Sequence, residues 1–258
     1  MKGKIMKGRS KMLKILISIL VIGTIACFIT WGIISYLGST EILQVKSIEN
    51  TGGNVYLIRL TKPQKKGWTA GSYAKITLPE VEKKDKRIRW LTITSLDNED
   101  ELVLLTKNSG SAFKKNLTSL SQGSEVKISW IGSKLKIKDE NSPLVLFGSD
   151  VGIATIRPIV KEWAGKREII LNHFDKNVLA FDNELSDLSS KNEKLNYSRS
   201  NSLEQSKEKL EEAVNKYGNK AIYILTGQPD DVESMSKYLK EKGIDNKQIK
   251  IDKFRGLK

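Results

Sequence analysis

The first residues with chemical potential lie in a strand-like stretch, residues 89–95, which reads RWLTITS. Alternate side chains of a strand share a face, so Arg89 and Leu91 are expected to point the same way. The guanidinium of Arg89 suits a bidentate contact with a phosphate group. A second segment, residues 109–114, is rich in small residues, which let backbone N–H groups approach an anion. Both segments are therefore candidates for binding a phosphate-bearing ligand.

A third candidate is the stretch 144–158, where an apolar run meets Gly148, Gly152 and then a helix-like pattern. A glycine turn at the start of a helix is a ready site for a pyrophosphate. Asp150 stands between the two glycines and would repel an anionic dinucleotide. This turn therefore predicts a nucleotide site whose strength depends on Asp150.

Cys27 and His173 are the only cysteine and the only histidine in the chain. One cysteine excludes cysteine-ligated iron–sulfur clusters and multi-cysteine zinc sites, and one histidine excludes multi-histidine metal sites and bis-histidine haem within this chain. We expect no metal site, and we expect His173 to be a satisfied core residue. No nucleophile-elbow motif supports a Ser-His-Asp triad.

The length of 258 residues allows about two domains of ordinary size. Residues 41–140 show period-2 alternation broken by polar turns, which is typical of strands. Six short strands of this kind predict a small antiparallel β-barrel. We expect them at 41–49, 54–61, 73–78, 89–96, 101–107 and 124–131.

Residues 141–258 alternate strand-like and helix-like patterns, which predicts an α/β domain with a doubly wound parallel sheet. A capping box at 202–205 opens one helix, and Pro229 fits the first position of another. The polar stretch 190–202 is expected to be a surface loop. We expect strands at 167–172, 221–226 and 247–252 and a helix at 181–189.

The stretch 89–95 resembles the flavin signature of ferredoxin–NADP⁺ reductase-type domains, which is Arg, any residue, Tyr, then Ser or Thr, with a Ser three residues further on. Leu91 stands at the aromatic position. Further segments resemble the same family in the family's order along the chain: 70–73, 109–114, 122–126, 144–158, 223–229 and 251–257.

The resemblance implies bound FAD, with NAD(P)H as the electron donor, and it assigns roles to individual residues. Thr92, at the flavin N5 edge, and Thr226, near the hydride path, would be the catalytic residues. Gly148, Gly152 and Gly227 would shape the dinucleotide cleft. The remaining residues of the cofactor site would be Arg89, Leu91, Ser95, Gly110, Ser111, Phe113 and Lys114, together with Thr92.

Residues 15–37 form an uncharged run of 23 residues, long enough to cross a hydrocarbon core of about 30 Å. The tail of residues 1–14 carries six positive charges and no acid, so the positive-inside rule predicts a cytoplasmic N-terminus and an extracytoplasmic domain. A cleaved signal peptide and a lipoprotein site at 24–27 are weaker alternatives, because the apolar run continues beyond Cys27.

The net charge is +14. The sequence has no basic stripe with interleaved aromatic residues, so we expect no nucleic-acid binding. The resemblance implies a flavin-dependent oxidoreductase that passes electrons from NAD(P)H through FAD to an unidentified acceptor, such as a membrane or surface electron carrier. Because NAD(P)H is scarce outside the cell, a flavin-bound electron relay and a degenerate scaffold remain alternatives.

Overall fold

The computed structural model describes residues 2–79, 81–82, 87–133, 135, 137, 139–175 and 180–254, with only the backbone for residues 2–15 and 37. The described chain divides into two compact units, Met1–Thr40 and Glu41–Lys258. The C-terminal segment 251–257, which resembles the reductase family, is described only as far as residue 254.

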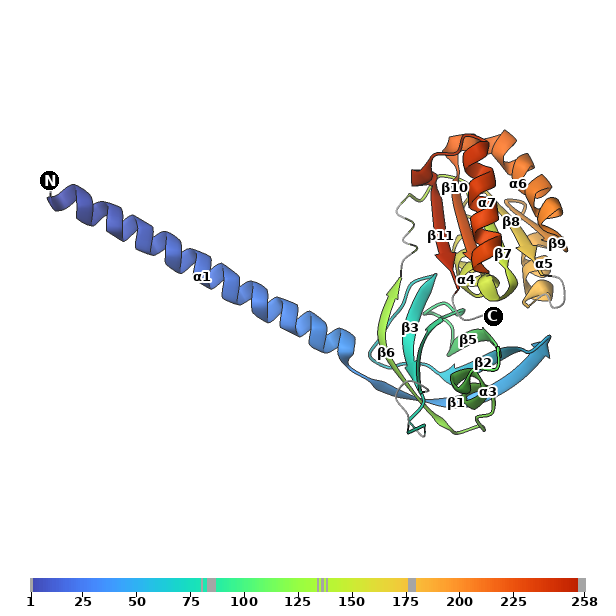
Figure 1. Cartoon of the computed structure of the whole chain (residues 1–258), viewed down its shortest axis with the longest axis horizontal. Helices are drawn as coiled ribbons and strands as arrows, with labels where there is room; N and C mark the ends of the chain where they lie inside the picture. Colours follow the sequence, from blue (N-terminus) through green and yellow to red (C-terminus); the bar gives the residue numbers. More distant parts are fainter. Residues whose placement is uncertain are drawn as a thin grey trace. The chain divides into compact units, whose positions relative to one another are not determined.

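The first unit is one helix, α1 (Lys2–Gly38), shown in blue in Figure 1. Its segment Leu16–Tyr36 has a mean hydropathy of 2.4 and none of its side chains is buried. By length and composition this segment could cross a membrane, although a signal sequence near an N-terminus would meet the same test.

The second unit begins with a six-stranded antiparallel sheet in the order β4-β3-β6-β1-β2-β5 (Figure 1). A bridge between Ile93 and Leu104 joins the chain after β4 to β5 at the other edge, which closes the sheet into a barrel. The predicted antiparallel barrel is confirmed. Its strands are β1 (Glu41–Gly52), β2 (Val55–Thr61), β3 (Ser72–Thr77), β4 (Ile88–Thr92), β5 (Glu101–Lys107) and β6 (Glu125–Ser133).

A short helix, α3 (Ala112–Thr118), covers part of the barrel interior. Its side chains Phe113 and Leu117 are fully buried in a cluster with barrel residues such as Ile76 and Leu104. The sequence pattern did not predict this helix, because only two of its seven residues are large and apolar.

The rest of the second unit contains a five-stranded parallel sheet in the order β11-β10-β7-β8-β9. The predicted doubly wound α/β architecture is confirmed. The domain boundary expected between residues 140 and 141 lies in the segment between β6 and β7, and it stays a prediction. The strands are β7 (Leu144–Ser149), β8 (Ile169–Phe174), β9 (Leu195–Ser200), β10 (Ile222–Gly227) and β11 (Ile249–Lys253).

Helices cover both faces of this sheet. Leu144 and Leu146 of β7 face one apolar cluster with α4 and α5, and Val145 and Phe147 face another with α6 and α7. Alternate residues of a strand point to opposite faces, so a strand covered on both sides is apolar throughout. The helices are α4 (Ile153–Trp163), α5 (Asp182–Ser190), α6 (Leu203–Tyr217) and α7 (Pro229–Glu241).

The loop expected at 190–202 is wrong in part, because β9 lies within it as an edge strand beside β8. Its polar residues gave no strand signal. They are used in side-chain hydrogen bonds, since Ser200 Oγ donates to Asn172 Oδ1 at 3.0 Å and Asn172 Nδ2 donates to Ser198 Oγ at 3.2 Å. The predicted helix start at Ser202 is confirmed, because Ser202 Oγ accepts from the Gln205 backbone N–H at 3.1 Å, while Gln205 Oε1 accepts from the Asn201 backbone N–H at 3.1 Å.

Candidate functional site

Two cationic side chains, those of Arg89 and Lys114, lie near enough for their charges to interact where β4 and α3 approach each other. The guanidinium carbon of Arg89 lies 5.7 Å from the centroid of the Phe113 ring. The ammonium group of the neighbouring Lys114 donates to Thr106 Oγ1. Burial, together with the nearby charge of Arg89, lowers the pKa of Lys114 to about 8. The structure therefore brings together three predicted cofactor residues, Arg89, Phe113 and Lys114. The like charges of Arg89 and Lys114 favour the binding of an anion beside them.

The loop before α3 is held in shape by its small residues. Gly110 has φ of +83°, a left-handed conformation that glycine adopts at little cost. Its N–H donates to Asn108 Oδ1 at 3.0 Å. Ser111 caps α3, because its Oγ accepts from the Lys114 backbone N–H. The predicted residues Gly110 and Ser111 thus fix the turn that places Lys114.

Arg89 and Leu91 share one face of β4, as expected, since they pair with Ile76 and Ala74 of β3. That face belongs to the barrel interior, because Ala74 is fully buried and Leu91 is 8% exposed. The Leu91 side chain is therefore buried among core residues, and stacking of a ligand ring on it finds no support in its placement.

The opposite face of β4 carries an aromatic that the motif did not indicate. Trp90 is 54% exposed, and its ring lies edge-on to Tyr73 at 5.4 Å between centroids. Thr92 shares this face, because alternate residues of a strand do so. Strand alternation in the sequence already places Trp90 on the face opposite Leu91. The pairing register of β4 with β3 shows that this face is the outer one.

Ser95 has a structural role in this geometry. It is fully buried. Its Oγ accepts from the Val103 N–H at 3.0 Å, and its carbonyl accepts from the Trp68 indole N–H at 2.8 Å. These bonds tie the chain after β4 to β5 and to Trp68.

The predicted glycines of the α/β part bring two loops into backbone contact. A Cβ on Gly152 would lie 2.4 Å from the Thr226 carbonyl oxygen, and a Cβ on Gly227 would lie 2.1 Å from the Ser149 carbonyl oxygen. A Cβ on Gly148 would lie 3.0 Å from a methyl group of α4. Thr226 is fully buried, and its Oγ1 donates to the Gly152 carbonyl at 2.8 Å. Gly148, Gly152, Gly227 and Thr226 therefore meet where β7 and β10 end.

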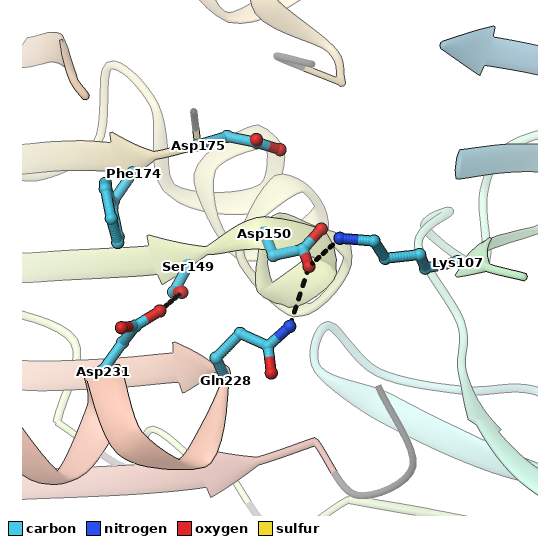
Figure 2. A pocket seen from close by; sticks show the side chains of 7 residues that line it. All are labelled: Lys107, Ser149, Asp150, Phe174, Asp175, Gln228 and Asp231. Carbon is cyan, nitrogen blue, oxygen red and sulfur yellow. Dashed lines mark hydrogen bonds and ion pairs between the residues drawn. The ribbon is translucent and has the colours of Figure 1, made fainter. Parts of the chain in front are cut away.

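A cavity of about 200 Å³ opens beside these strand ends (Figure 2). In open α/β sheets, ligands bind in the crevice outside the carboxyl ends of the strands, where the strand order reverses. The order β10-β7-β8 places that point between β7 and β10. The cavity is lined by Lys107, Ser149, Asp150, Phe174, Asp175, Gln228 and Asp231.

The polar groups of this cavity bond with one another. Asp150 Oδ2 accepts from Lys107 Nζ at 2.8 Å and from Gln228 Nε2 at 2.9 Å, and Ser149 donates to Asp231 (Figure 2). Three aspartates and one lysine line the cavity, so its net charge is negative. A dinucleotide diphosphate would meet a repulsive field here.

His173 lies on β8 and is fully buried, as expected of a core residue. Burial lowers the pKa of His173, so its ring is neutral near pH 7. Among the described residues, no group of His, Cys, Asp and Glu side chains has the arrangement of a metal site.

Solved structures with the same arrangement of barrel and α/β sheet are known. The cytochrome P450 reductase GcoB of Amycolatopsis aligns with a TM-score of 0.71 at 17% identity, over 86% of this chain and 72% of that chain. A ferredoxin–NADP⁺ reductase of Neisseria gonorrhoeae with bound FAD and NADP aligns with a TM-score of 0.70 at 16% identity, over 83% and 99%. The fold is that of the ferredoxin–NADP⁺ reductases.

This reductase fold also occurs in the CS-b5R domains of human Ncb5or, in their NAD⁺ form, with a TM-score of 0.69 at 17% identity. That alignment covers 83% of this chain and 69% of the human one. No protein-family model and no curated protein matches the sequence. The likeness to ferredoxin–NADP⁺ reductases therefore lies in the fold.

Proposed function

We propose that this chain is a flavin-dependent oxidoreductase that passes electrons from NAD(P)H through FAD to an acceptor. The observation that carries the proposal is that Arg89 lies over the ring of Phe113, while its charge acts on the neighbouring Lys114. An anion bound beside both side chains would offset the like-charge interaction that helps to lower the pKa of Lys114, and a flavin diphosphate is such an anion. The fold supports the same ligand, since the Neisseria gonorrhoeae structure holds FAD and NADP.

In this proposal, Arg89 and Lys114 hold the diphosphate, and Gly110 and Ser111 shape the loop beside it. β4 is the last strand of its sheet, and Arg89 is exposed at that edge. A ligand lying along the edge can reach Arg89 and also the outward face of β4. When bound there, FAD would supply hydride and electron transfer, while the protein supplies position and electrostatics.

The outward face of β4 would position the flavin ring. Trp90 offers an exposed ring for stacking, and Thr92 on the same face offers a hydroxyl to the polar edge of the flavin. Leu91 and Ser95, also predicted to bind the cofactor, act through the core and through backbone bonds in this proposal. Thr226 would act by holding the two glycine loops together.

The nicotinamide donor would use the crevice at the ends of β7 and β10. The glycine contacts there match what a dinucleotide turn requires, whereas the three carboxylates oppose its phosphates. This opposition favours a second candidate function, an electron relay that holds flavin and receives electrons from a protein carrier.

The helix α1 would anchor the chain in a membrane, and the acceptor would then be a membrane or surface electron carrier. The supporting observation is the uncharged segment Leu16–Tyr36. The basic residues before it favour a cytoplasmic N-terminus.

The test is an absorption spectrum of the full-length chain purified in detergent, recorded with and without added FAD. We expect flavin bands that remain after gel filtration and that bleach on adding NADH or NADPH. Bleaching by dithionite but not by either nucleotide would favour the relay. A folded protein that stays colourless and refuses both FAD and FMN would refute flavin binding altogether.

A further inference from the structure

Asp150 has an unusual backbone and an almost buried side chain. Its φ is +54°, in the left-handed region that residues other than glycine seldom adopt. Only 12% of its side chain is exposed, between the ammonium of Lys107 and the amide of Gln228 (Figure 2). Such strain persists where surrounding contacts hold it, and it concentrates at functional sites.

The carboxylates of this crevice stand where a diphosphate would bind. The starts of helices attract anions, because their free N–H groups and dipoles point outward. Asp150 opens the helical turn that leads into α4, and Asp231 lies in the first turn of α7. Both carboxylates thus lie at helix starts, where a ligand phosphate would be attracted, and they carry negative charge into that region.

Lys107 is the one cation among the described residues that line the crevice. It comes from β5 of the barrel, and it is 2.8 Å from Asp150. A lysine ammonium is a compact charge that suits a phosphate oxygen equally well. The ion pair with Asp150 therefore withholds the group that would bind a nucleotide phosphate.

We propose that Asp150 and Lys107 form an autoinhibitory gate on the nucleotide crevice. This inference rests on the proposed function for the identity of the ligand, a nicotinamide dinucleotide. The dinucleotide enters when its phosphate displaces the Asp150 carboxylate from Lys107. The gate lowers affinity by repulsion and by occupying Lys107, so removal of the Asp150 charge makes the chain a better nucleotide binder.

The experiment measures the dissociation constants of NADH and NADPH by calorimetry, on the full-length chain in detergent. We expect Asp150→Asn to lower the constant about tenfold, which corresponds to the loss of one close repulsion and the release of Lys107. Asp150→Gly is the second variant, because glycine accepts the positive φ and keeps the turn if the asparagine variant misfolds.

Asp175→Asn is the matched control, since Asp175 lines the same cavity and the substitution removes the same unit charge. We expect a smaller gain from it, because Lys107 stays paired with Asp150. Equal gains from the two variants would mean a general field effect and would overturn the gate. Unchanged or weaker binding in both Asp150 variants would also overturn it.

Lys107→Gln adds the decisive comparison. We expect it to weaken binding strongly in the Asp150→Asn background and only slightly in the wild type, where Lys107 is already occupied. Equal effects in the two backgrounds would contradict the gate. Calorimetry needs no flavin, so a colourless protein whose Asp150→Asn variant binds NADPH more tightly would refute the flavin proposal and still support the gate.

Discussion

Arg157 and Glu184 form a two-pronged ion pair, with Arg157 Nε 2.7 Å from Glu184 Oε2 and Nη2 2.7 Å from Oε1. The same guanidinium reaches the barrel, where it donates to the Thr94 carbonyl at 2.7 Å and lies 3.2 Å from Glu99. One nearly buried arginine thus joins α4, α5 and the chain after β4. Arg157 therefore adds polar contacts between the barrel and the α/β part to the apolar cluster that also joins them.

We predict that Arg157→Ala lowers the free energy of unfolding by roughly 2 kcal/mol, because Glu99 and Glu184 lose their short hydrogen bonds to the guanidinium and keep Lys161, at 3.3 Å and 3.4 Å, as a cationic neighbour. The measurement is a denaturant titration of the full-length chain in detergent, followed by circular dichroism. Lys191→Ala is the matched control, since its pair with Asp187 is exposed on both sides and contributes at most about 0.5 kcal/mol. Similar losses in the two variants would contradict the central role of Arg157.

We predict that flavin affinity falls as the pH rises above about 8. The pKa of Lys114 is lowered to about 8, so below this pH the lysine carries the charge that attracts the diphosphate. A bound anion favours the protonated form, so affinity is constant below pH 8 and is lost above it. The measurement is FAD titration between pH 6 and 10. In the Lys114→Gln variant, the affinity for FAD should be low and should show no fall near pH 8.

The same pKa shift predicts a change in stability without flavin. Between pH 8 and the ordinary lysine pKa of 10.5, the unfolded chain holds a proton that the folded chain has released. Stability therefore rises with pH in this window, and the rise should vanish in Lys114→Gln. Identical slopes in the wild type and the variant would show that Lys114 is not buried as described.

We predict that Trp90→Ala weakens FAD binding by about 1 kcal/mol, the usual contribution of an aromatic contact, while Trp90→Phe retains most of it. FAD should also quench tryptophan fluorescence in the wild type and less so in Trp90→Phe. Trp163→Phe is the control, because Trp163 lies in the α/β part at the end of α4. There its ring centroid is 5.0 Å from the guanidinium carbon of Arg167. Unchanged affinity in Trp90→Ala would remove the stacking role and leave the phosphate contacts in place.

We predict that the chain stays in the membrane fraction after alkaline carbonate washing, because Leu16–Tyr36 is uncharged and long enough to cross a bilayer. Protease added to intact cells should degrade the region after residue 40, as the basic N-terminal tail implies. Release by carbonate would indicate a cleaved signal sequence. Protection from protease would place the domain on the cytoplasmic side, where NAD(P)H is abundant.

The sequence alone determined the types of the two sheets and their order along the chain, but not the strand β9. Period-2 alternation before residue 140 and alternating helix and strand patterns after it depend on which face each side chain buries, and this is a local property. Arg89 stands out locally as a charged residue in a strand, whereas Lys114 could be assigned only through the resemblance of residues 109–114 to the reductase family. The capping box at Ser202 and the helix start at Pro229 are local signals too.

The tertiary structure alone decided which faces and partners those residues have. A shift of one residue in strand pairing exchanges the two faces, so only the register of β4 with β3 puts Leu91 inside and Trp90 outside. The strand β9 forms from polar residues because Asn172 of β8 bonds with them. Asp150 meets Lys107 across 43 positions of sequence, and such a contact depends on packing between distant elements, which no local pattern encodes.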